Sequence, residues 1–122
     1  SIVVVPRERL MVRNGEVWEG RIHKEPRLIE AARTAGELLG LRGPCNMQGI
    51  LDDSGQFSFT DINLRFGSGA VHTIAAGGNI PMMIYKELIG ESPESVVAPI
   101  QEGSIMTRFH DCYFLPSDKF KS

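Results

Sequence analysis

The segment from Pro44 to Phe66 restricts the possible folds of this chain more than any other stretch. Two runs that contain apolar residues, 44–51 and 56–66, flank the polar cluster Asp-Asp-Ser-Gly at 52–55. Runs of this length around a cluster that ends in glycine predict a β-hairpin. If Ser54 and Gly55 form a two-residue turn, Gln48 lies opposite Asp61, and Asn46 lies opposite Asn63. A turn one residue longer, without a bulge, would place these side chains on opposite faces.

This register brings several polar side chains to one face of the predicted hairpin. Directly opposed residues have Cβ atoms about 4.5–5.5 Å apart, and alternate residues along a strand share a face. The shared face carries the side chains of Asn46, Gln48, Asp61, Asn63 and Arg65. Magnesium takes oxygen ligands, usually with only one or two protein carboxylates, and a guanidinium can hold a phosphate oxygen. The pattern is therefore compatible with a magnesium–nucleotide site, and equally with a solvated polar face of an ordinary hairpin.

Two aromatic residues affect the choice between these readings. Phe57 and Phe59 alternate with polar residues and are expected on the same face as Asp61. Apolar rings beside the polar group favour a partly enclosed cleft over open water.

The paired motifs also resemble a known family. Gly-Pro-Cys-Asn-Met-Gln at 43–48, followed by Thr-Asp-Ile-Asn-Leu-Arg-Phe-Gly-Ser-Gly at 60–69, is similar to the end of an ATP-grasp domain. Carbamoyl-phosphate synthase large subunits and their single-domain relatives carry G-x-x-N-x-Q and then E-I-N-P-R-F in this region. Here Asp61 stands in place of the usual Glu, and Leu64 in place of the usual Pro.

The resemblance implies specific roles for these residues. Gln48, Asp61 and Asn63 match magnesium-binding positions, and Arg65 matches a catalytic, phosphate-contacting position. Asn46 and Gln48 are candidate cofactor ligands beside them. The implied cofactors are ATP and Mg²⁺, with Mn²⁺ as an alternative metal.

The overall composition narrows the functional classes. The chain has 122 residues, a formal charge of −2 and a pI near 5.9, so there is no basic footprint for nucleic acid. It lacks both a signal-peptide pattern and the run of about 20 apolar residues that a membrane span needs. Two cysteines and three scattered histidines do not have zinc-site spacing, and reduced thiols are expected. These features predict a cytoplasmic protein that binds neither nucleic acid nor membrane.

The first part of the chain is expected to form two strands and a helix. Residues 2–13 and 16–23 read as strands joined by a type I′ turn at Asn14-Gly15. Arg7, Arg9 and Arg13 share a face of the first strand, where they can form a charged edge that discourages strand addition. The resembling family also has a Pro-Arg-x-Arg segment here, which makes Arg7 and Arg9 alternative candidates for binding phosphate or substrate.

Helical spacing predicts a helix from Pro26 to about Leu39, which ends at Gly40. A second helix is expected from Asn79, as N-cap, to Leu88 or Ile89. The glycine-rich stretch 67–78 reads as a loop that contains His72 as an ordinary polar residue. Strands are expected at 96–100 and 105–114, before a polar, frayed tail at 116–122.

These expectations define an α+β fold, a mainly antiparallel sheet with two helices on one face. Residues 1–122 are interpreted as a single partial domain, the C-terminal portion of an ATP-grasp domain without its nucleotide-binding N-terminal part. The implied function is that of an ATP-dependent carboxylate–amine ligase fragment, whose parent binds a nucleotide and a carboxylate substrate. Either a homodimer or the missing N-terminal half is expected as partner. The alternative is a non-catalytic binding or assembly module that keeps the fold only.

Overall fold

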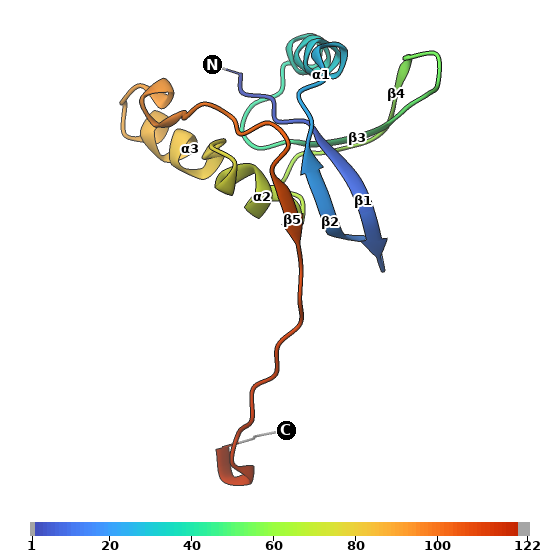
Figure 1. Ribbon diagram of the computed structural model, residues 1–122. Coiled ribbons are helices and arrows are strands. Elements are labelled where there is room, and N and C mark those ends of the chain that lie inside the picture. The colour runs from blue at the N-terminus through green and yellow to red at the C-terminus, as the bar shows by residue number, and fades with distance from the viewer. Residues whose placement is uncertain (1, 120–122) are drawn as a thin grey trace.

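The computed structural model describes residues 2–119 and has an α+β architecture (Figure 1). Residues 120–122 of the predicted tail lie outside this range. The strands are β1 (Arg7–Arg13), β2 (Glu16–Ile22), β3 (Asn46–Leu51), β4 (Phe57–Asn63) and β5 (Ile105–Thr107). The helices are α1 (Pro26–Leu38), α2 (Ala70–Ala75) and α3 (Ile80–Leu88), with short 3₁₀ turns η1 (Pro93–Val96) and η2 (Ser117–Lys119).

All strand pairing is antiparallel, as predicted, but the strands form two separate sheets. One sheet has the order β1-β2-β5, and the other is the hairpin β3–β4. The hairpin extends to one side of the three-stranded sheet, whereas α2 and α3 lie on its other side (Figure 1). The predicted α+β class is confirmed. The structure differs from the prediction in having a third helix and in dividing the strands between two sheets.

The first strand is shorter than the sequence suggests. Residues 2–6 belong to no strand, and β1 starts only at Arg7. Pro6 has no N–H to donate to a ladder, and its carbonyl accepts the last bond of the pairing, from His23 N at 3.1 Å. At the other end Asn14 and Gly15 have φ angles of 49° and 76°, which confirms the predicted type I′ turn.

The two long helices have the predicted boundaries. α1 begins at Pro26 behind Glu25, whose side chain accepts a bond from Arg27 N, and Gly40 follows its end with a φ of 60°. In α3 the Asn79 side chain accepts from Met82 N at 3.2 Å.

Three other predicted segments differ from the structure. The 67–78 loop contains the six-residue helix α2, which flanking glycines conceal in the sequence. The strand expected at 96–100 is replaced by η1 and irregular chain. The strand expected at 105–114 is reduced to Ile105–Thr107. Arg108 N still donates to the Trp18 carbonyl of β2 at 2.8 Å, and the segment that follows extends away from the rest of the molecule (Figure 1).

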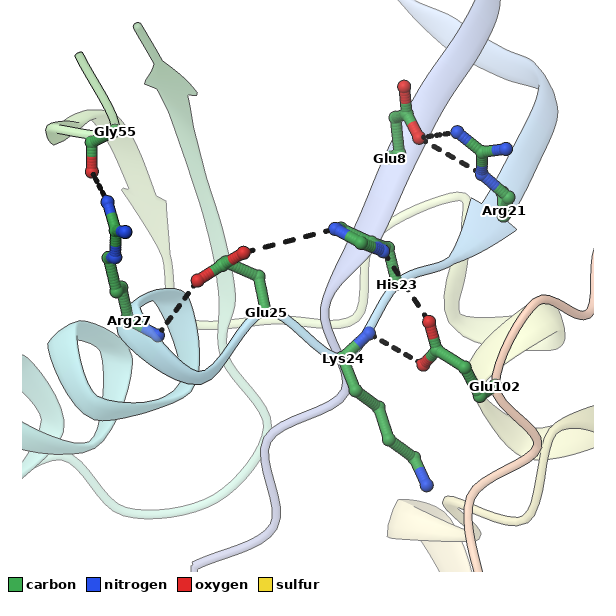
Figure 2. A network of polar contacts seen from close by, with 8 residues as sticks. All are labelled: Glu8, Arg21, His23, Lys24, Glu25, Arg27, Gly55 and Glu102. Carbon is green, nitrogen blue, oxygen red and sulfur yellow. Dashed lines mark hydrogen bonds and ion pairs between the residues drawn. The ribbon is translucent and has the colours of Figure 1, made fainter. Parts of the chain in front are cut away.

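A polar network connects α1 to the hairpin and to the segment before β5 (Figure 2). His23 lies between two carboxylates, with Nδ1 at 3.5 Å from Glu102 and Nε2 at 4.0 Å from Glu25. Lys24 N donates to Glu102 at 2.7 Å, and Arg27 Nη1 donates to the Gly55 carbonyl at 3.1 Å. The start of α1 is thereby fixed relative to both sheets.

The apolar core is small. The buried apolar residues of the described chain are Ile22, Ala76 and Met83, while many large apolar side chains are exposed. Within residues 2–119, none of the helices has the length and apolar character needed to span a bilayer.

Candidate functional site

The hairpin β3–β4 has the predicted register, for a reason that the sequence did not reveal. Gln48 pairs with Asp61 and Asn46 with Asn63, as expected. The turn, however, contains three residues, because Asp52 N bonds to the Gln56 carbonyl at 2.9 Å and Gly55 has a φ of 82°. A bulge between Gln48 and Gly49 accommodates Thr60 as an extra residue. The longer turn and the bulge compensate for each other and restore the pairing.

The bulge changes the position of the two aromatic residues. Phe59 pairs with Gly49, whereas Asp61 pairs with Gln48, and neighbouring residues of β3 point to opposite faces. Phe57 and Phe59 therefore lie on the face opposite to Asp61, and the prediction of a common face was wrong. Their rings contact each other edge to face, with centroids 4.9 Å apart.

The predicted metal ligands form a donor set that fits magnesium in its chemistry. Asn63 Nδ2 donates to Asp61 Oδ2 at 2.5 Å, which leaves the second carboxylate oxygen and the Asn63 amide oxygen for other partners. Together with the Gln48 amide oxygen they supply one carboxylate and two neutral oxygens, so a magnesium ion here would depend on phosphate and water for its other ligands. Among the described residues, no three His, Cys, Asp or Glu side chains are grouped for a metal.

Arg7 is the most constrained of the candidate residues. Its Nη1 donates to the Gly69 carbonyl at 2.9 Å and to Thr73 Oγ1, and its Nη2 donates to Asn46 Oδ1 at 3.3 Å. Burial lowers the pKa of Arg7 because desolvation disfavours the charged guanidinium. Its bonding partners are neutral, so its positive charge is not cancelled by them.

Arg9 and Arg65 are exposed and much less constrained. In the described chain, Arg9 donates one long bond, to Gln48 Oε1 at 3.4 Å, and Arg65 donates to the neighbouring Phe66 carbonyl at 3.0 Å. By contrast, Arg21 and Arg108 are paired with Glu8 and Glu16. The guanidinium groups of Arg9 and Arg65 are thus free to take an anionic ligand.

One cavity of about 880 Å³ connects most of these residues. Such a volume is in the range of small-molecule sites, roughly 300–1,000 Å³. Five of the predicted site residues line it, namely Arg7, Arg9, Asn46, Gln48 and Arg65, whereas Asp61 and Asn63 do not. The three arginines therefore share the cavity with the side chains of β3, whereas the Asp61 carboxylate of β4 lies outside its lining.

Two residues near the cavity have limited chemical roles. Cys45 lines it, but burial raises the pKa of its thiol, so it stays protonated and is a poor nucleophile at neutral pH. His72 was predicted to be an ordinary polar residue of a loop, and this prediction was wrong. It lies in α2, and its side chain is only 3% exposed. Its Nε2 lies 3.2 Å from Ser104 Oγ, and its Nδ1 has no partner within the described residues.

The sequence did not identify two residues that support the site. Thr73 is buried on α2 and accepts from Arg7, and Arg108 follows β5 and donates to the Ser68 carbonyl. Both contacts join segments far apart in the chain, and no local pattern in the sequence marks them.

Comparison with protein families identifies a family for most of the chain. A family model described as "ATP-grasp in the biosynthetic pathway with Ter operon" matches residues 1–112. A search of curated proteins finds no match.

Proposed function

Because the chain belongs to the ATP-grasp family, we propose that it forms the C-terminal portion of an ATP-dependent ligase related to carbamoyl-phosphate synthase. The match over residues 1–112 and the paired motifs at 43–48 and 60–69 support this proposal. The substrates are Mg²⁺–ATP, a carboxylate and an amine or other nucleophile. A carboxylate oxygen attacks the γ-phosphorus, ADP leaves, and the nucleophile then displaces phosphate from the acylphosphate.

The proposed ligand roles follow the donor chemistry of the hairpin. Gln48, Asp61 and Asn63 supply the oxygens that would hold magnesium, or manganese, on the triphosphate. Magnesium held there would supply neutralisation of the phosphate charge. Arg65 and Arg9 hold phosphate oxygens through their guanidinium groups, which are not bound to carboxylates in the described chain.

The observation that carries the proposal is the pairing of Gln48 with Asp61 and of Asn46 with Asn63. This register places four oxygen-bearing side chains on one face, beside a cavity lined by Arg7, Arg9 and Arg65. The cationic lining favours an anionic ligand, and the single carboxylate favours a metal that arrives together with phosphate.

Asp61→Asn in the ligase that carries this chain tests the proposal. The change removes the only carboxylate of the donor set while nearly preserving its shape, so Mg²⁺-dependent ADP formation should fall at least about tenfold. The melting temperature should stay within a few degrees of wild type, because Asp61 is exposed.

Asp53→Asn is the matched control. Asp53 lies in the turn of the same hairpin and is also exposed, and its loss should not change turnover. Unchanged turnover in a folded Asp61→Asn enzyme would contradict the metal role and support the alternative, a non-catalytic assembly module.

Location and partners belong to the same proposal. Cys45 and Cys112 are free thiols, which fits a reducing, cytoplasmic compartment. The residues of this chain form one side of the nucleotide site. The other side comes from an N-terminal half or from another copy of the chain.

A further inference from the structure

Two arginines from opposite edges of the three-stranded sheet meet at the glycine loop 67–69. Arg7 in β1 donates to the Gly69 carbonyl at 2.9 Å, and Arg108, directly after β5, donates to the Ser68 carbonyl. Arg108 is itself fixed by a 2.7 Å bond from Nε to the Val17 carbonyl. Consecutive carbonyls of the loop are thus bound from two sides.

The loop is also in contact with β3. A Cβ atom at Gly67 would lie 2.6 Å from Asn46 Oδ1, so the glycine backbone packs directly on this side chain. The same oxygen accepts from Arg7 Nη2 at 3.3 Å. Arg7 therefore connects β1, β3, the loop and, through Thr73, helix α2.

We infer that Arg7 is a positioning residue for the proposed phosphate site: it holds the loop that sets the place of Arg65, and does not itself bind phosphate. The inference rests on the proposed function. Arg65 lies between Asn63, which is paired in the hairpin, and Gly67, which packs on Asn46. Both ends of this short connection are fixed, so the position of the Arg65 backbone depends on how firmly the loop is held.

The bonding of the arginines distinguishes these two roles. Arg7 makes bonds to three protein acceptors and is half-buried, whereas Arg9 and Arg65 are exposed. A guanidinium engaged in this way would have to break bonds to neutral partners before it could grip a ligand with its fork. Arg9 and Arg65 would each give up a single bond, to Gln48 Oε1 at 3.4 Å and to the Phe66 carbonyl at 3.0 Å, so their cost is smaller.

Thr73 makes the inference testable, because it bonds Arg7 and is only 3% exposed. Thr73→Val removes the acceptor and keeps the shape, and Thr73→Ser keeps the hydroxyl as a conservative control. Arg7→Lys removes the forked guanidinium group. Arg13 lies on the same strand and contacts the Trp18 ring, so Arg13→Lys is the matched control. The readouts on the full chain are amide exchange at Ala70 and His72, which bond to the loop carbonyls of Gly67 and Gly69, and the affinity for magnesium pyrophosphate measured by NMR titration.

We expect Thr73→Val and Arg7→Lys each to accelerate exchange of these amides about tenfold, as the loss of one charged hydrogen bond would. The double variant should be no faster than the faster single variant, because both remove the same contact. Pyrophosphate affinity should fall roughly three- to tenfold in Thr73→Val and stay at the wild-type level in Thr73→Ser and Arg13→Lys. In an Arg65→Ala background, Thr73→Val should cost no further affinity.

Two results would overturn the inference. Wild-type exchange in both Thr73→Val and Arg7→Lys would show that the contact does not hold the loop. Loss of affinity in Arg7→Lys alone, with Thr73→Val unchanged, would make Arg7 a direct ligand and leave the proposed function intact. If the wild-type chain does not respond to magnesium pyrophosphate, the proposed function fails, and the exchange rates still decide whether Arg7 and Thr73 hold the loop.

Discussion

At the scale of single residues, His72 should make folding sensitive to acid. Burial is the main reason that the pKa of His72 lies below its ordinary value of 6.5, with the positive charge of Arg7 acting in the same direction. The unfolded chain then binds more protons than the folded chain, so the free energy of unfolding should decrease as the pH falls below about 6.5 and level off below the folded-state pKa.

Urea unfolding between pH 7.5 and pH 5, at roughly half-unit steps, measures this effect. His72→Gln should have a flatter profile, by at most about 1.4 kcal/mol per pH unit, which corresponds to one proton. His110→Gln, at an exposed position, is the control and should follow wild type. An identical slope in wild type and His72→Gln would mean that folding does not lower the pKa of His72.

The identity of the candidate residues could be predicted from the sequence, but their bonding could not. The motif 60–69 pointed to Asp61, Asn63 and Arg65 because their types and spacing are local properties. Arg7 and Arg9 are arginines of the same strand, but Arg7 bonds to Thr73 and Arg9 does not. This difference depends on how α2 packs against β1. Burial and hydrogen bonding are tertiary properties, and they distinguish two residues that look alike in the sequence.

At the scale of the elements, two glycines should respond in opposite ways to the same substitution. A Cβ atom at Gly49 would lie 2.2 Å from the Phe57 ring and 2.5 Å from the Ser58 carbonyl, whereas Gly36 in α1 has nothing within 4 Å. Gly49→Ala should destabilise the chain by about 1–3 kcal/mol, because hairpin backbone must move. Gly36→Ala should stabilise it by about 0.5–1 kcal/mol through the higher helix propensity of alanine.

Chemical denaturation of both variants at pH 7.5 tests this pair. A neutral Gly49→Ala variant would show that Phe57 does not lie over β3 as it does in the structure. Failure of Gly36→Ala to stabilise would indicate that α1 contributes little to the folded state.

The hairpin shows why an element can be predicted correctly with incorrect details. The polar cluster before Gly55 signals a turn, but a three-residue turn and a two-residue turn have similar residue preferences. Thr60 carries no mark of a bulge, since β-branched residues suit regular strands equally well. The longer turn and the bulge have opposite effects on the register, so the pairing of Gln48 with Asp61 is as predicted. The difference from the prediction remains in the face occupied by Phe57 and Phe59.

At the scale of the whole molecule, the chain leaves much of its apolar and backbone surface uncovered. Leu38, Leu88, Phe109, Tyr113 and Phe114 are each at least 80% exposed. The segment after β5 extends away from the rest of the molecule (Figure 1). Strands β1 and β5 are the two edges of their sheet, with unpaired backbone groups. Neither the composition nor the periodicity of the sequence specifies which surface covers these apolar side chains and sheet edges.

The 122-residue chain should therefore self-associate. Large exposed apolar patches usually mark an interface, and a closed two-fold dimer hides them with one self-complementary surface. The charged residues Arg7, Glu8 and Arg9 on β1 oppose continuous strand stacking, so a dimer is favoured over fibrils. Light scattering after size exclusion, at micromolar concentration, should give a mass near twice 13.5 kDa. A monomer at these concentrations, with β1 amides well protected from exchange, would contradict this prediction, because the uncovered edge and apolar surface would then be stable in water.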